Sequence, residues 1–292
     1  MMPAGRVCVL PNLYKKYLLG SDAIRLKLNA LRYDSFFIIE NLNRSIIRNN
    51  INSRTAGSTR QRIGLSELKK TSFYCPHLVE QKKIGFFFQE IERKIKIIER
   101  KIDILKKYKE GLCDYLFKES IHDSIHLYDL VANNPSQMLT KDIEQNVGIY
   151  PVYDATGKIL KFINYYQQSS DTISIIKYGS GCGRTFISKG YHSILGTMTD
   201  LKPFDQADVL FIYAYTLSRH FASIIKKYIE IGTTPNLYFS DYSKATISNK
   251  AIKNKKIISL IIRSIEKKEL LLFNEFNKLK NIKKYLLNSL FI

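Results

Sequence analysis

The stretch from Leu78 to Phe117 constrains the fold more than any other part of the chain. Apolar residues recur there every seven positions, and a second apolar row follows four positions after each of them. The first row is Ile84, Ile91, Ile98, Leu105 and Leu112, and the second is Phe88, Ile95, Ile102 and Leu116, with Lys109 in one slot. These two rows are the seam of a coiled-coil helix. At about 1.5 Å per residue, this stretch predicts a rod of roughly 54 Å.

The same pattern returns 174 positions later. Its first row is Ile258, Ile265, Leu272, Leu279 and Leu286, and its second row is Ile262, Phe276 and Leu290. Lys283 occupies the slot of Lys109, whereas Glu269 stands where Ile95 would be expected. A long helix with an apolar seam needs a partner, so we expect the two helices to pair with each other.

The segments before each helix share this offset. Asp34 falls on Asp208, Phe37 on Phe211 and Gly5 on Gly179. Residues 119–174, however, have no counterpart before Met1. The sequence therefore predicts two related globular parts, of which the first is shortened by about 55 residues.

Local patterns predict further elements. Val7–Leu10 and the alternating residues of 22–28 suggest strands, and residues 34–50 and 211–229 each suggest one helix. A strand at Tyr150–Tyr153 is followed by a turn at 154–158, and Thr172–Lys177 is a second apolar strand. Gly179, Gly181 and Gly183 form a glycine-rich loop that ends at Arg184.

The chain is strongly basic, with 46 Lys and Arg against 26 Asp and Glu and a formal net charge of +20. Such a balance favours a polyanionic partner, and nucleic acid is the usual one. The excess is concentrated in residues 1–77 and 250–292, whereas residues 120–249 hold 11 charges of each sign. The larger globular part would therefore contact DNA through local clusters.

Cysteine spacing and hydropathy indicate the compartment. Cys8, Cys75, Cys113 and Cys182 form neither a CxxC pair nor a regular framework, which suggests free thiols in a reducing compartment. The sequence has no apolar run long enough for a membrane span and no secretory leader pattern at its start. We therefore expect a cytoplasmic protein without a membrane partner.

The order of parts resembles the specificity subunit of type I restriction-modification enzymes. The motifs that carry the resemblance are "YPVYDATGK" at 150–158, "IIKYG" with the following glycines up to residue 183, and "GTTPNL" at 232–237. In the first part they are "GRV" at 5–7, Ser21-Asp22, "GSTR" at 57–60 and "LVEQ" at 78–81, which opens the long helix. The usual entry motif is degenerate before the second helix.

The resemblance implies an α+β fold in which globular target-recognition domains alternate with two long helices that pair as an antiparallel coiled coil. Residues 1–77 would be the C-terminal part of a truncated first target-recognition domain, and 78–118 the first long spacer helix. Residues 119–250 would be a complete second target-recognition domain, and 251–292 the second spacer helix.

The resemblance also implies the function. The chain would recognise a bipartite target in double-stranded DNA, with two readers up to roughly 54 Å apart, or on the order of 16 base pairs. Two methylation subunits would dock on the helices, and restriction subunits would attach to these. S-adenosylmethionine would bind the methylation subunits, and no cofactor would bind this chain.

The residues expected to contact DNA lie in the turn, in the glycine-rich loop and in a basic cluster of the first part. They are Thr156, Lys158, Lys177, Tyr178, Arg184, Arg54, Arg60 and Arg62. Arginine can pair bidentately with guanine, and lysine mostly meets phosphate. Solvated surface charge is the alternative for each of them.

The sequence offers no convincing catalytic or metal site. Asn134-Pro135-Ser136 does not match the loop with which adenine methyltransferases hold a flipped base, and the glycine-rich loop lacks the Lys-Ser/Thr of a P-loop. His122 and His126 have helical ligand spacing without a third ligand, and the Asp residues show no nuclease pattern. We therefore expect a non-catalytic subunit.

Three alternatives remain open at this point. The chain could be a coiled-coil adaptor without a DNA role, a degenerate remnant with an incomplete first domain, or a homodimer that reads a symmetric target. Salt-dependent duplex binding, protease sensitivity confined to residues 1–77 and the mass in solution would separate these alternatives.

Overall fold

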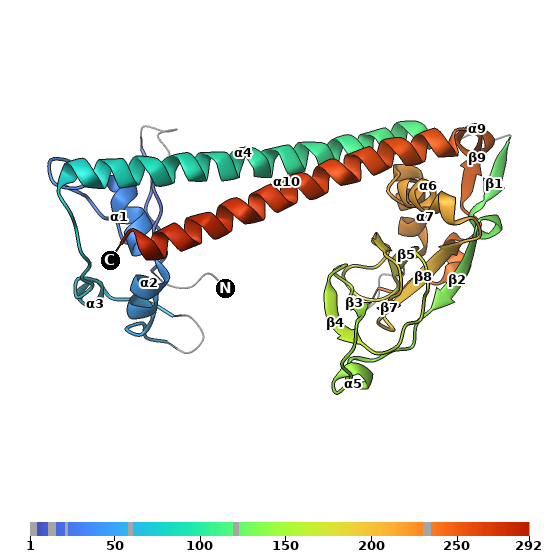
Figure 1. Cartoon of the computed structure of the whole chain (residues 1–292), viewed down its shortest axis with the longest axis horizontal. Helices are drawn as coiled ribbons and strands as arrows, with labels where there is room; N and C mark the ends of the chain where they lie inside the picture. Colours follow the sequence, from blue (N-terminus) through green and yellow to red (C-terminus); the bar gives the residue numbers. More distant parts are fainter. Residues whose placement is uncertain are drawn as a thin grey trace. The chain divides into compact units, whose positions relative to one another are not determined.

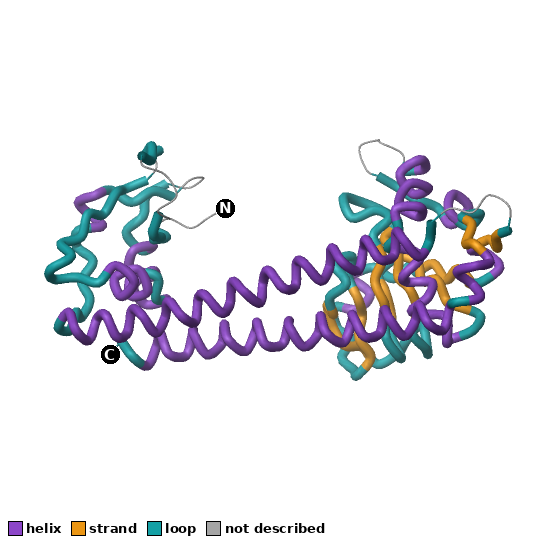
Figure 2. The backbone as a smooth tube through the Cα atoms, turned by 90° about the horizontal axis from the view of Figure 1, so that it is seen from above, coloured by secondary structure: helices purple, strands orange, loops and turns teal. Residues whose placement is uncertain are grey.

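A computed structural model of the chain describes residues 5–10, 16–20, 23–57, 61–118, 123–229 and 235–291 (Figure 1). The chain divides into two compact units. Unit 1 consists of Met1–Ile102 and Leu271–Ile292, and unit 2 of Asp103–Leu270. Figure 2 shows that helices and loops make up the described part of unit 1, whereas the named strands all belong to unit 2.

Unit 1 is built on short helices packed against two long ones. The short helices are α1 (Ser35–Leu42), α2 (Ser45–Asn52) and α3 (Leu65–Leu68). Residues of α1 and α2 share a core with the first part of α4 (Leu78–Leu116) and the last part of α10 (Lys255–Ser289). The ring of Phe291 lies 5.2 Å from that of Phe37 and 5.8 Å from that of Phe88, measured between centroids. Residues from opposite ends of the chain thus complete one core.

Three sequence predictions for unit 1 are wrong. The expected strand at Val7–Leu10 is absent, because the Asn43 side chain accepts from the Val7 N–H at 3.2 Å and donates to the Val7 carbonyl at 2.7 Å in place of a neighbouring strand. The described residues of 22–28 are likewise loop. The helix expected over 34–50 is two helices, since Arg44 adopts an extended conformation with ψ of 145° between α1 and α2.

The described residues of unit 2 form three small sheets. Strands β2 (Val131–Pro135), β8 (Met198–Pro203), β5 (Thr172–Ile176) and β6 (Thr185–Ser188) form the largest, in that order and antiparallel throughout. In the second sheet, β3 (Tyr150–Tyr153) pairs antiparallel with β4 (Ile159–Ile163) and parallel with β7 (Ser193–Ile194). Strands β1 (Ser124–His126) and β9 (Thr246–Ser248) form an antiparallel pair.

Helices cover the largest sheet. The helices α6 (Val209–Thr216) and α7 (Arg219–Tyr228) share a core with residues of β5 and β8, and Phe211, Ile212 and Tyr215 are fully buried there. The remaining elements are η1 (Leu127–Asp129), α5 (Thr140–Ile143), η2 (Gln206–Asp208), α8 (Phe239–Tyr242) and α9 (Asn249–Lys253). The single helix expected over 211–229 is wrong, because Ser218 caps a new helix by accepting from the Phe221 N–H.

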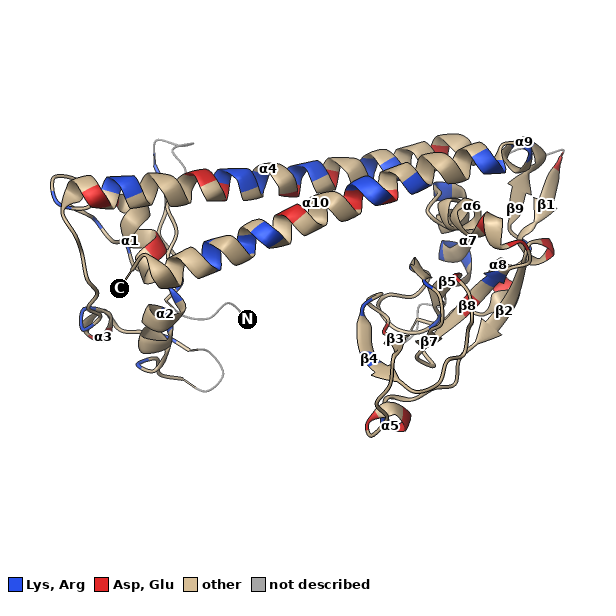
Figure 3. Cartoon of the chain, viewed as in Figure 1, with Lys and Arg blue, Asp and Glu red and all other residues tan. Residues whose placement is uncertain are grey.

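The long helices lie antiparallel within each unit. In unit 1, Phe88 of α4 contacts Phe291, and one turn later Glu92 pairs with Lys283. In unit 2, Lys109 of α4 pairs with Glu266 and Glu269 of α10. All ten predicted first-row seam residues are buried or half-buried. Lys and Arg are interspersed with Asp and Glu along α4 (Figure 3). The prediction of an α+β fold with two long helices is confirmed.

The 174-residue repeat extends to element boundaries. Helix α1 falls on α6 and α3 on α8, and α2 and α7 begin at equivalent residues. Contacts repeat as well. Phe291 packs on Phe37 as Phe117 packs on Phe211. Asp34 and the equivalent Asp208 both bond to the start of a long helix, Asp34 through its N–H to Gln81 and Asp208 through its carboxylate to Lys255. The two units therefore share the same arrangement of helices.

The structure also describes the state of the cysteines and the length and apolar character of the helices. All four cysteines are free thiols, and burial raises the pKa of Cys113 to about 12. Within the described ranges, no helix combines the length and apolar character that a membrane span requires.

Candidate nucleic-acid interface

The turn between β3 and β4 is organised by one carboxylate. Asp154 accepts from the Thr156 N–H at 2.8 Å, from the Thr156 hydroxyl at 2.6 Å and from the Lys158 N–H at 3.2 Å. Burial opposes the charge, but the hydrogen bonds from Thr156 and Lys158 prevail and lower the pKa of Asp154. Gly157 closes the turn with φ of +75°, which glycine adopts without strain. The Thr156 side chain is therefore committed to the turn, whereas Lys158 is exposed.

The loop between β5 and β6 is fixed by glycines and backbone hydrogen bonds. Gly179 and Gly183 have φ of +89° and +82°. The Gly183 N–H donates to the Ile176 carbonyl at 2.9 Å, and the Gly179 N–H donates to the Pro235 carbonyl at 3.0 Å. A Cβ atom at Gly183 would come within 2.5 Å of the Ile225 side chain, so the loop also packs tightly against α7.

Three predicted residues project from this loop. The Lys177 ammonium lies 5.4 Å from the centroid of the Tyr178 ring, and burial lowers the pKa of Lys177. Tyr178 is 38% exposed and forms a bridge with Asn236. Arg184 is exposed, and its guanidinium forms no ion pair within the described ranges. These groups are suited to binding phosphate or base edges.

The structure brings the turn and the loop together. Phe186 of β6 lies 6.1 Å from Tyr153 between ring centroids, and a Cβ atom at Gly157 would approach the Phe186 ring to 3.2 Å. Ala155 packs against the same apolar cluster as Phe186. The predicted residues of unit 2 thus share one end of β3, β4, β5 and β6. DNA contact by Thr156, Lys158, Lys177, Tyr178 and Arg184 stays a prediction.

The basic cluster of unit 1 is described in part. Arg60 lies outside the described residues. Arg54 lies two residues before Ala56, whose backbone forms hydrogen bonds of 2.9 Å in both directions with the backbone of Arg62. Arg54 also donates to the Glu67 carbonyl at 3.5 Å, while Arg62 is exposed. Their contact with DNA also stays a prediction.

Ion pairs join the long helices at equivalent places. Lys109 Nζ lies 2.6 Å from Glu266 and 2.8 Å from Glu269, and Lys283 Nζ lies 2.6 Å from Glu92. The pairs Lys109–Glu266 and Lys283–Glu92 are thus equivalent, since Lys109 and Lys283 are 174 positions apart and so are Glu92 and Glu266. The second carboxylate of each lysine differs, because Glu269 on α10 serves Lys109 whereas Glu40 on α1 serves Lys283 at 2.8 Å. This explains why Glu269 interrupts the apolar seam.

An exposed apolar stripe, not predicted from the sequence, lies beside the seam. On α4 it consists of Phe87, Ile97, Ile104, Tyr108 and Tyr115, all exposed. Each of these residues precedes a seam position by one residue, and Ile257, Leu271, Ile282 and Tyr285 of α10 do the same. The signal was present in the sequence as a second seven-residue spacing.

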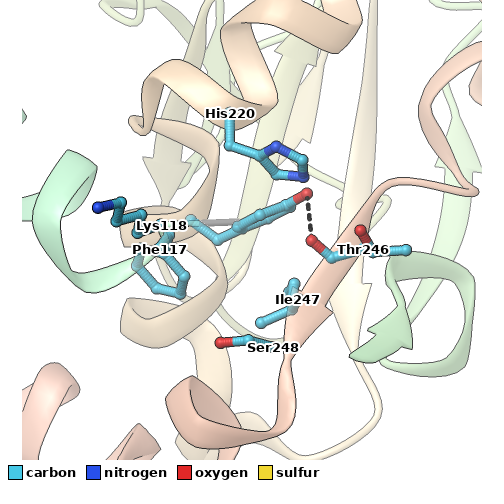
Figure 4. A pocket seen from close by; sticks show the side chains of 7 residues that line it. Phe117, Lys118, His220, Thr246, Ile247 and Ser248 are labelled. Atoms are coloured by element: carbon cyan, nitrogen blue, oxygen red, sulfur yellow. Dashed lines mark hydrogen bonds between the residues drawn. The ribbon is translucent and has the colours of Figure 1, made fainter. Parts of the chain in front are cut away.

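One cavity of unit 2 is too small for a substrate. A cavity of about 10 Å³ in unit 2 is lined by Phe117, Lys118, Tyr215, His220 and residues 246–248 (Figure 4). The Tyr215 hydroxyl beside it donates to the Thr246 carbonyl at 3.1 Å. Such a cavity has room for about one water molecule and none for a substrate. The described residues also contain no cluster of three or more His, Cys, Asp and Glu that could hold a metal ion.

Comparisons with known proteins agree with this architecture. Residues 2–107 match the family model described as type I restriction modification DNA specificity domain. The crystal structure of the type I restriction-modification S subunit from M. genitalium matches with a TM-score of 0.65 at 19% identity, over 91% of this chain and 74% of that one.

A second solved structure comes from a study of complex assembly and conformational transition of the type I R-M system. It matches with a TM-score of 0.50 at 13% identity, over 91% of this chain and 73% of that one. No curated protein gave a significant sequence match. The resemblance inferred from the motifs is confirmed: residues 2–107 match the family model of the type I restriction modification DNA specificity domain, and the chain has the fold of a type I S subunit.

Proposed function

We propose that this chain is the specificity subunit of a type I restriction-modification complex. It would recognise a bipartite target in double-stranded DNA and hold the methylation and restriction subunits in place without catalysing a reaction itself. The observation that carries the proposal is the 174-residue repeat, in which each long helix follows a related set of short helices and Phe291 packs on Phe37 as Phe117 packs on Phe211.

Unit 2 supplies the better defined reader. Lys158, Lys177 and Arg184 gather at one end of its strands, and the rigid turn and loop hold their backbones in place. A net charge of +20 attracts the phosphate backbone from a distance, and the local basic groups would then fix the register on the duplex. Arg184 is the residue best suited to read a guanine edge.

The bipartite target follows from the long helix. Helix α4 is continuous over 39 residues and is therefore about 58 Å long. Its seam is apolar at most positions, and an ion pair within each unit joins α4 to α10. A stiff spacer of this kind suits two short recognition sequences separated by bases that are not read.

The exposed stripe of α4 and α10 supports docking of other subunits. Ile104, Tyr108 and Tyr115 expose about 60–80% of their surfaces, although side chains of this type are usually covered in a finished assembly. We assign this stripe to the methylation subunits, two of which would fit a structure with two related halves. Restriction subunits would bind through them, and S-adenosylmethionine would be held by the methylation subunits.

Methylation mapping tests the proposal. The chain is co-expressed in the cytoplasm of a host that lacks this modification, together with a methylation subunit from a type I system, and N6-methyladenine is mapped with and without the chain. We expect a new bipartite motif that depends on the chain. Co-purification without any chain-dependent methylation or duplex binding would instead support the coiled-coil adaptor or a remnant that no longer reads DNA.

A further inference from the structure

Unit 2 carries a cluster of three tyrosine rings that lies apart from the predicted DNA-contacting residues. The ring centroids of Tyr150 and Tyr166 are 5.0 Å apart, those of Tyr166 and Tyr191 are 4.8 Å apart, and those of Tyr150 and Tyr191 are 5.9 Å apart. Two of the contacts are edge-to-face, the geometry that aromatic rings prefer. Tyr191 is 53% exposed and Tyr166 is 43% exposed, so the cluster lies at the surface.

Three separate segments bring these rings together. Tyr150 is the first residue of β3, Tyr166 lies between β4 and β5, and Tyr191 lies between β6 and β7. The turn with Lys158 and the loop with Arg184 join the same strands at their other ends. The tyrosine cluster and the basic cluster are thus separated by the length of one strand.

A network of backbone and side-chain hydrogen bonds fixes the two loops. The Gln168 N–H donates to the His192 carbonyl at 2.9 Å, and the His192 N–H donates back to the Gln168 carbonyl at 3.0 Å. The Ile194 N–H donates to the Gln167 side chain at 3.0 Å. Gly190, with φ of +60°, donates its N–H to Asp171 at 2.7 Å and so sets the direction of Tyr191.

The layer beneath the loops is polar and fully buried. His192 Nε2 lies 3.0 Å from the Thr172 hydroxyl and 3.3 Å from Asp200, and Ser174 donates to Asp200 at 2.6 Å. A buried polar network contributes less to stability than well-packed apolar side chains, but it fixes geometry when its members have partners. Here it holds the segment that carries Tyr191, and the cluster is organised before any ligand arrives.

The chemistry of this surface favours DNA. The three phenolic hydroxyls have no hydrogen-bond partner among the described residues and can donate to phosphate oxygens, while the rings can pack against sugars and base edges. Lys189 lies in the same loop as Tyr191, is exposed, and forms no ion pair within the part of the chain that the structure describes. The nearby Asp171 is already bound to Gly190.

Resting on the proposed function, we propose that Tyr150, Tyr166 and Tyr191, with Lys189, form a second DNA contact of unit 2 that determines part of its specificity. Five residues of β5 separate it from the basic cluster, which corresponds to about 17 Å or roughly five base pairs. Unit 2 would therefore contact its target at both ends of the strands, over a site of about this length.

The test uses the full chain with its methylation subunit. Tyr166 and Tyr191 are changed together to Ala and, separately, to Phe, and Tyr128→Ala serves as the control because Tyr128 is 44% exposed outside the cluster. Duplexes carry the motif that the unmodified chain selects. The Ala pair should raise Kd about tenfold to a hundredfold and relax the motif on one side only, whereas the control should match the unmodified chain.

Lys189→Gln gives a second measurement that does not depend on the rings. It should reduce the slope of log K against log salt by about one. The proposal is overturned if the Ala pair keeps both Kd and motif, or if it loses only the methylation subunit, which would identify a protein contact. If the Ala pair does not fold, the other two variants decide. The proposal is then overturned if the Phe pair keeps the Kd of the unmodified chain and Lys189→Gln keeps its slope of log K against log salt. Absence of any motif with the unmodified chain would instead refute the proposed function.

Discussion

Removal of Lys109 tests the internal electrostatics of the helix pair. Its side chain is 9% exposed and contacts Glu266, which is 35% exposed, and Glu269, which is 15% exposed. Lys109→Met keeps the aliphatic stem but leaves the Glu269 carboxylate buried without its cation. Breaking a buried pair in this way costs about 3–5 kcal/mol. Because water screens Glu266, we expect the lower end of that range, about 3 kcal/mol.

Calorimetry and hydrogen exchange measure this loss. For a unit of this size, about 3 kcal/mol corresponds to a decrease in Tm of about 6–12 °C. Faster exchange should be confined to Asp103–Leu270, since the pair lies within unit 2. Arg93→Met is the control, because Arg93 pairs with Glu90 on the exposed surface and should contribute under about 1 kcal/mol.

A double variant shows whether the buried charge is the cause. Lys109→Met with Glu269→Ile removes both charges and places at 269 the residue that the repeat carries at Ile95. Most of the lost stability should return, because no buried carboxylate remains without a partner. The reasoning is refuted if Lys109→Met melts within about 1 °C of the unmodified chain, or if the double variant is no more stable than the single one.

Three further predictions follow from the same contacts. Burial lowers the pKa of Lys109, but Tyr213, Glu266 and Glu269 raise it above 10.5, so the stabilisation is complete below that pH and is lost as pH rises through the folded value. The Tm of the unmodified chain should therefore fall more steeply above pH 10.5 than that of the double variant, and equal falls would contradict this. Arg184→Gln should weaken duplex binding by about 1–3 kcal/mol in titrations and relax the motif at one base pair, and an unchanged motif would exclude a base contact. Phe291→Ala should cost unit 1 about 3–5 kcal/mol, whereas Phe117→Ala should act on unit 2, and exchange changes in the other unit would contradict the assignment.

The long-range order of the chain was predictable because it depends on repetition. Seven-residue spacing revealed both helices, and the 174-residue offset revealed the related units. The break at Arg44 was not predictable in the same way. Apolar residues continue on both sides of it, and the helix ends there because Asn43 is engaged with Val7, 36 residues earlier in the chain.

The candidate site was predictable only in its local chemistry. The turn at 154–158 and the glycine loop were visible as sequence patterns, but the commitment of Thr156 to Asp154 was not. The tyrosine cluster unites residues 150, 166 and 191, whose proximity depends on hydrogen bonds between loops. Spacing along a chain carries no information about such contacts until the strand order is known.

The completion of unit 1 by α10 imposes an order on biosynthesis. Glu40 and Lys283 are separated by 243 residues, so at 5–20 residues per second the partner of Glu40 leaves the ribosome about 10 to 50 s after it. Unit 2 is contiguous in the chain and can form during that interval. The apolar seam around Phe88, Ile91 and Ile95 meanwhile lacks the cover of α10, which makes the nascent first half the part most dependent on chaperones and most vulnerable to proteases.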